Sequence, residues 1–181
     1  MFREMKNSDS ELAREVQAFM ASGRLVPDEV TYAMVKDRTS RPDTAGSYVL
    51  DGYPRTAVQA EQLEELAKEQ GKKIQAIEVD VPKEELMKRL TGRRSCPECG
   101  EIYNIYSKPP QVEGVCDFHP NAVLEHRADD YEEKVNVRLD TYDQQTKPLL
   151  EYYKKSGRLK KVVGTGEVET IYAEVEKLLG L

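Results

Sequence analysis

Residues 73–94, KIQAIEVDVPKEELMKRLTGRR, join a strand pattern directly to a helix pattern. Residues 73–81 are rich in β-branched side chains, which predicts a strand. Pro82 suits the first turn of a helix, because proline lacks the amide hydrogen that this turn leaves unbonded. We therefore expect a helix over residues 82–94. A strand followed at once by a helix is the repeating unit of α/β proteins.

The same alternation extends in both directions along the chain. Helical spacing of apolar residues predicts further helices, and short β-rich runs predict further strands. We expect helices over 9–22, 27–37, 56–70, 129–155 and 167–181, and strands over 47–52 and 158–164. In the helix over 129–155, Asp129 and Glu132 would cap the start and Pro148 would kink or break it. The expected fold is α/β, with a parallel sheet flanked by helices.

Charge and composition exclude several classes of protein. The 181 residues carry a net charge of −6, which argues against a nucleic-acid partner. No apolar run approaches the roughly 18 residues that span a membrane, and the start lacks the apolar core of a secretory signal. Three cysteines cannot form a closed disulfide framework. We expect a cytoplasmic protein without a membrane partner.

All three cysteines and one of the two histidines lie in residues 96–119. Cys96 and Cys99 form a C-x2-C pair, and Cys116 and His119 form a C-x2-H pair. Zinc prefers four nitrogen and sulfur ligands in tetrahedral geometry, and a closed set of four is structural. The spacing predicts one structural zinc per chain, with Asp117 as an alternative fourth ligand. The competing interpretation is three reduced, buried cysteines beside an exposed histidine.

Arginines crowd both flanks of this cysteine segment. Two lie four residues apart before it, and two lie eleven residues apart after it, so each pair could share a helix face. A further arginine follows the turn DGYP, and another is the third residue of the sequence. In a chain of negative net charge, such arginines suggest phosphate binding, although solvated helix faces with ion pairs are the alternative. The candidates are Arg3, Arg55, Arg89, Arg93, Arg127 and Arg138.

Four stretches, taken in order, resemble successive signatures of bacterial adenylate kinase in its long-lid, zinc-containing form. They are residues 23–31, 49–63, 90–104 and 126–139. The resemblance covers nearly the whole chain. It implies a P-loop nucleoside monophosphate kinase-like core of residues 1–94 and 129–181, with AMP-binding helices in about 1–37. Residues 95–128 would be the zinc-binding lid. The implied reaction is reversible phosphoryl transfer from MgATP to AMP, giving two ADP, by a monomer.

The resemblance also implies roles for individual residues. The AMP site would comprise Arg3, Arg24, Leu25, Val26, Gly52, Tyr53, Pro54, Arg55, Gln59, Arg127 and Arg138. Within it, Arg55 would bind the phosphate and Gln59 would read the adenine edge. The ATP site would comprise Arg93, Ile102, Tyr103 and Gly166. The catalytic residues would be Arg89, Arg127, Arg138 and Asp51, with Asp51 holding the waters of Mg²⁺. Asp129 and Asp130 would help the lid to close.

One part of the family pattern is not matched. The family begins with a strand, a glycine-rich phosphate loop ending in Gly-Lys, and a helix. The 181 residues contain no G-x-x-x-x-G-K-[ST], and the turn at Gly164 has neither the lysine nor the spacing. A chain without the first strand and the loop is expected to be nearly inactive. The alternatives are a nucleotide-binding fragment without turnover and a zinc-ribbon interaction module.

Overall fold

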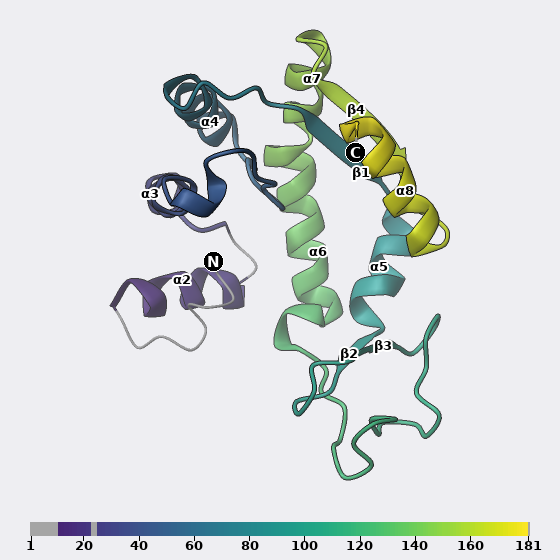
Figure 1. The fold of residues 1–181 in the computed structure, drawn as a ribbon. Helices are drawn as coiled ribbons and strands as arrows, with labels where there is room; N and C mark the ends of the chain where they lie inside the picture. The colour runs from purple at the N-terminus through teal and green to yellow at the C-terminus, as the bar shows by residue number, and fades with distance from the viewer. Residues whose placement is uncertain (1–10, 23–24, 181) are drawn as a thin grey trace. The chain divides into compact units, whose positions relative to one another are not determined.

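The computed structural model describes residues 11–22 and 25–180, which form two compact units. The sheet unit comprises residues 25–81 and 140–180, and the clip unit comprises residues 11–22 and 82–139. The helices are α2 (Glu11–Ser22), α3 (Asp28–Thr39), α4 (Ala57–Glu69), α5 (Lys83–Thr91), α6 (Glu132–Thr141), α7 (Pro148–Lys155) and α8 (Val168–Leu179). The strands are β1 (Ala76–Asp80), β2 (Arg93–Ser95), β3 (Ile102–Asn104) and β4 (Leu159–Val163) (Figure 1).

Two parallel strands form the sheet of the sheet unit. β1 pairs with β4 from Ala76 opposite Leu159 to Asp80 opposite Val163, and α8 runs beside β4 (Figure 1). Helix α4 packs against α7 through Ala60, Leu149 and Tyr153. The expected parallel sheet flanked by helices is confirmed, since a strand, helices and a second strand follow one another here as in other α/β proteins.

The expected strand over residues 47–52 is wrong. The structure assigns no strand to these residues, and Val49 is 83% exposed. A strand exists only where its backbone hydrogen-bonds to a neighbour. Within the described part of the chain, β1 has β4 as its partner and residues 47–52 pair with neither. The β-rich composition of this run was therefore not enough to make it a strand.

The clip unit is built on a short antiparallel hairpin. β2 pairs with β3 from Arg93 opposite Asn104 to Ser95 opposite Ile102, and Ser95 also bridges to Glu125. Cys96, Tyr103, Cys116, Ala122 and Leu124 form its small buried cluster. The helix expected over 82–94 ends early at Thr91, because the following residues join the β2–β3 ladder. A side chain at Gly92 would lie 2.6 Å from Tyr106, so only glycine fits at this junction.

The long helix expected over 129–155 consists of several pieces. Asp129 lies in a short 3-10 turn, Ala128–Asp130, and Tyr131 is extended with ψ near 142°, so α6 starts at Glu132. The expected capping by Asp129 is therefore wrong. The break near Pro148 is confirmed, because residues Tyr142–Thr146 widen into a π-helix before α7 begins at this proline. Among the helices of the described residues, none has the length and apolar character needed to cross a membrane.

Candidate functional site

The three cysteines and His119 come together in the clip unit. Their ligand atoms all lie within 4.8 Å of one another. Cys99 Sγ and His119 Nδ1 are each 3.8 Å from Cys116 Sγ. The β2–β3 hairpin carries the first pair, in a turn closed by the bond from the Gly100 amide to the Cys96 carbonyl at 3.0 Å. This Cys3His cluster is a candidate metal site, and its donors are the ones that zinc prefers.

Asp117, the alternative fourth ligand, has a different partner. Its Oδ1 accepts a hydrogen bond from the Gln111 amide at 2.8 Å, and the side chain is not part of the ligand cluster. The geometry thus groups His119 with the three cysteines. The other ring nitrogen of His119 lies 3.9 Å from Glu98 Oε2. A carboxylate at that position can orient a ligand imidazole.

The Tyr103 hydroxyl supports the cluster from the interior of the clip unit. It lies 3.6 Å from Cys116 Sγ and accepts a hydrogen bond from the Asp117 amide at 2.9 Å. Burial acts to raise the pKa of the Cys116 thiol, but hydrogen bonds from Tyr103 and His119 outweigh it and lower this pKa to about 6. The thiolate, which is the form that binds metal, is therefore favoured.

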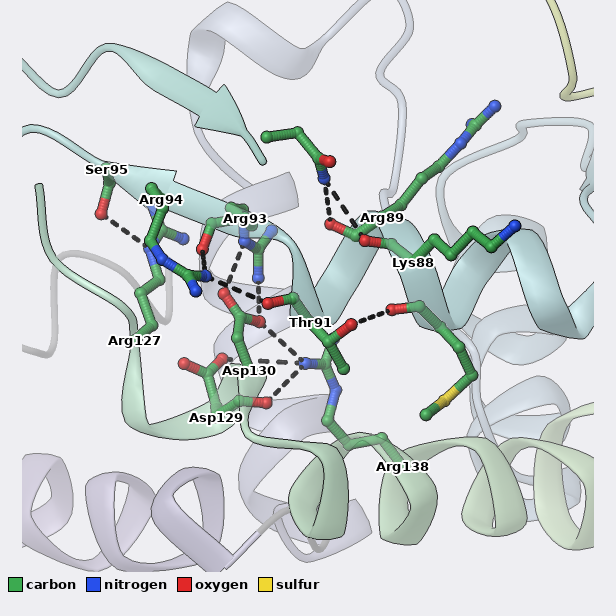
Figure 2. A network of polar contacts seen from close by, with 12 residues as sticks. Lys88, Arg89, Thr91, Arg93, Arg94, Ser95, Arg127, Asp129, Asp130 and Arg138 are labelled. Carbon is green, nitrogen blue, oxygen red and sulfur yellow. Dashed lines mark hydrogen bonds and ion pairs between the residues drawn. The ribbon is translucent and has the colours of Figure 1, made fainter. Parts of the chain in front are cut away.

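A fully buried carboxylate organises the arginines of the clip unit (Figure 2). Asp130 is 0% exposed, and Arg93 donates to its two oxygens from Nε at 2.7 Å and from a terminal nitrogen at 2.6 Å. The hydrogen bond that Arg93 donates to Asp130 raises the pKa of Arg93 against the opposing effect of burial. Arg138 donates to the Asp129 carbonyl at 3.1 Å and lies 3.7 Å from the Asp130 carboxylate.

The helix-face arguments for the arginine pairs are wrong. Arg93 lies in β2, so it does not share a face of α5 with Arg89, whose side chain extends away from Asp130 and pairs with Glu85 (Figure 2). Arg127 precedes the 3-10 turn and is extended, so helical spacing does not relate it to Arg138. Arg93 and Arg138 nevertheless meet at Asp130, while Arg127 contacts Ser95 Oγ at 3.4 Å. The acidic residues after Arg127 were the sequence signal for this centre.

In the sheet unit, the turn DGYPRT lies against the start of α3. Gly52 has φ near +67°, and Arg55 Nε donates to its carbonyl at 2.7 Å. The Arg55 amide donates to Gln59 Oε1 at 2.8 Å, and Gln59 Nε2 donates to Asp28 Oδ1 at 2.8 Å. Burial raises the pKa of Tyr53, on the same turn, to about 12. Asp28 was not among the residues expected from the sequence.

The remaining expected residues are distributed between the two units. In the sheet unit, Val26 is buried, Leu25 and Pro54 are half-buried, and Asp51 and Gly166 are exposed. In the clip unit, Ile102 is 47% exposed and Tyr103 only 2%, so the ring of Tyr103 faces the interior. Arg3 and Arg24 lie outside the described residues.

Comparison with known proteins gives a consistent answer. The family model described as "Adenylate kinase" matches residues 1–158. The adenylate kinase of Methanothrix thermoacetophila is 46% identical over 180 residues, covering 99% of this chain and 83% of that protein. That of Anaeromyxobacter dehalogenans is 46% identical over 181 residues, covering 99% and 84%. That of Bacillus subtilis is 44% identical over 181 residues, covering 99% and 83%. With a family match over most of its length and such relatives, the chain belongs to the adenylate kinase family.

Proposed function

We propose that this chain is a phosphotransferase that moves a phosphoryl group reversibly from MgATP to AMP, giving two ADP. The observation that carries the proposal is the family match, with relatives named adenylate kinase that are 44–46% identical over 99% of the chain. The geometry of each unit agrees with a part of this reaction.

In this proposal the sheet unit holds the acceptor, AMP. Arg55 binds the AMP phosphate, since a guanidinium can donate two parallel hydrogen bonds to it. The positive φ of Gly52 lets the backbone turn sharply beside this side chain. Gln59 reads the base. The remaining proposed AMP contacts are Arg3, Arg24, Leu25, Val26, Tyr53 and Pro54.

The clip unit supplies positive charge for the transferred phosphoryl group. Arg89, Arg127 and Arg138 neutralise the charge that builds up on it, and Arg93 binds ATP. The bond to Asp130 fixes the Arg93 guanidinium in advance, so less conformational freedom is lost on binding. In the clip unit, Ile102 is a proposed ATP contact, and Tyr103 is one through its backbone because its ring is buried. In the sheet unit, Gly166 is a proposed ATP contact. Catalysis then rests on alignment and charge neutralisation, without a covalent intermediate.

Mg²⁺ accompanies ATP, and Asp51 is the residue proposed to hold its waters. The exposed carboxylate of Asp51 is an oxygen ligand open to solvent, as a hydrated Mg²⁺ requires. When bound, the ion neutralises phosphate charge.

The Cys3His cluster is proposed to hold one structural zinc ion. Three thiols and one imidazole within 4.8 Å of one another complete a tetrahedral set and leave no position for a substrate. The zinc would hold residues 95–128 together. Their buried cluster of five residues is too small to stabilise them alone. These residues would form the lid, and residues 1–94 with 129–181 the core. We further propose that the protein is a cytoplasmic monomer.

A second candidate is AMP binding without turnover by these 181 residues. The observation in its favour is that they contain no G-x-x-x-x-G-K-[ST] sequence to cradle the phosphates of ATP.

Two measurements on the same preparation separate the candidates. A coupled assay follows ADP formation from AMP and MgATP, and calorimetry follows AMP binding. Turnover with binding supports the kinase, and binding alone supports the second candidate. If neither turnover nor AMP binding is observed, both candidate functions are wrong. Arg55→Met should abolish AMP binding, whereas Arg41→Met, which removes an exposed arginine paired with Asp37, should leave it unchanged.

A further inference from the structure

We infer that Asp28 determines base specificity by fixing the side-chain amide of Gln59 in one orientation. In that orientation the amide fits the Watson–Crick edge of adenine and rejects that of a 6-oxopurine. The inference rests on the proposed AMP site, and it adds a positioning residue that does not itself touch the nucleotide.

The contacts form a closed network between the starts of α3 and α4. Gln59 Nε2 donates to Asp28 Oδ1 at 2.8 Å, and Gln59 Oε1 accepts from the Arg55 amide at 2.8 Å. The other oxygen of Asp28 accepts from the Thr56 hydroxyl at 3.1 Å. The Thr56 oxygen in turn caps α4 by accepting from the Gln59 amide at 3.1 Å. Each of the four residues thus restrains the others.

The chemistry of the partners allows only one amide orientation. A carboxylate accepts hydrogen bonds and a backbone N–H donates them. If the Gln59 amide were flipped, its oxygen would face the Asp28 carboxylate and its NH2 group would face the Arg55 N–H. Both hydrogen bonds would be lost and replaced by repulsion. Gln59 is only 2% exposed, so water cannot readily compensate.

The fixed amide still has bonding capacity for a ligand. A side-chain amide has two N–H donors and two oxygen lone pairs. Asp28 accepts from one of these N–H groups, and the Arg55 amide donates to one lone pair. Among the hydrogen bonds of the described residues, none uses the other N–H or the other lone pair of Gln59. A bound base would have to displace the groups that cover this edge.

The Watson–Crick edges of adenine and of a 6-oxopurine need opposite arrangements of donor and acceptor from this amide. Adenine presents an acceptor at N1 and a donor at its 6-amino group, which match the remaining N–H and lone pair of Gln59. Hypoxanthine presents a donor at N1–H and an acceptor at O6, and would need the flipped amide. Guanine has the same reversed pattern. Discrimination thus comes from the cost of flipping Gln59, which Asp28 and the Arg55 amide impose together.

The test compares AMP with inosine monophosphate, because the two share ribose and phosphate and differ only at positions 1 and 6 of the ring. Binding of each is measured by calorimetry for the wild-type protein and for Asp28→Asn. An asparagine can both donate and accept, so it can follow the flip of Gln59. We expect the wild type to prefer AMP by at least about tenfold, and Asp28→Asn to reduce this ratio by about tenfold. The matched control is Asp37→Asn, an exposed carboxylate on the same helix, which should leave the ratio unchanged.

The readout is the ratio of two affinities, which a purely structural role for Asp28 would not move. If Asp28→Asn does not melt cooperatively, Asp28→Ser, whose hydroxyl also donates and accepts, takes its place. An unchanged ratio in the folded variant, or equal binding of both nucleotides by the wild type, overturns the inference and leaves the proposed function standing. If the wild type binds neither nucleotide, the proposed AMP site and the inference fall together.

Discussion

Replacing Asp130 by asparagine removes the buried charge at the centre of the clip unit and keeps the side-chain shape. The Asp130 carboxylate is 0% exposed, is held by two hydrogen bonds from Arg93, and lies 3.7 Å from Arg138. Loss of one partner from a buried ion pair costs about 3–5 kcal/mol, because the other charge remains uncompensated. We expect the lower end, about 3 kcal/mol, since Arg93 is 24% exposed and can turn partly to water.

The neighbouring Asp129 provides the matched control. Its side chain is 39% exposed and its carboxylate approaches Arg138 only to 3.9 Å, so Asp129→Asn should cost about 0–1 kcal/mol. For a chain of this size, a loss of 3 kcal/mol lowers the unfolding temperature by about 6–12 °C. Thermal unfolding followed by circular dichroism, under identical metal and salt conditions, measures both variants. Equal shifts for the two would refute the assignment of Asp130 as the anchor of the arginines.

Three further predictions address the metal, the core and the acceptor turn. Elemental analysis should find about one zinc per chain, and Cys99→Ser or a chelator should remove it and lower the unfolding temperature; metal-free protein prepared without chelator would contradict this. The buried Tyr153 hydroxyl makes no hydrogen bond to the described residues. The urea concentration at which Tyr153→Phe unfolds should therefore equal or exceed that of the wild type. Burial raises the pKa of Tyr153 to about 12 because it disfavours the ionised form, so stability is unaffected by this group below about pH 10 and falls as pH rises towards 12; Tyr153→Phe should flatten the decline, and an unchanged slope would contradict it. Gly52→Ala places a Cβ 2.8 Å from the Arg55 guanidinium and should weaken AMP binding at least about tenfold, whereas Gly71→Ala, at a similar φ with no atom within 4 Å, should only destabilise; equal AMP affinities would contradict this.

Local patterns in the sequence predicted the features that depend on neighbouring residues. The helix after Pro82, the strand before it and the break near Pro148 follow from backbone chemistry within a few residues. The four-ligand cluster was predictable because two-residue spacing puts each pair on one turn, and four such ligands have few other uses.

Features that depend on distant partners were not predictable in this way. The run over 47–52 has strand composition, but a strand also needs a hydrogen-bonded neighbour that composition does not reveal. Arg93 follows a helical pattern and yet lies in β2, because pairing with residues 102–104 competes with the helix end. The full burial of Asp130 depends on packing from several segments. The contact between Asp28 and Gln59 joins residues 31 positions apart.

Equilibrium titration with four nucleoside monophosphates tests whether Gly52, Arg55 and Gln59 form the proposed AMP site. We expect saturable binding of one AMP per chain. UMP and GMP should bind more weakly because their edges need the flipped Gln59 amide, and CMP should bind more weakly because its single ring buries less apolar surface than adenine. Equal affinity for all four nucleotides, or no binding of AMP, would show that these residues are not an adenine-specific AMP site.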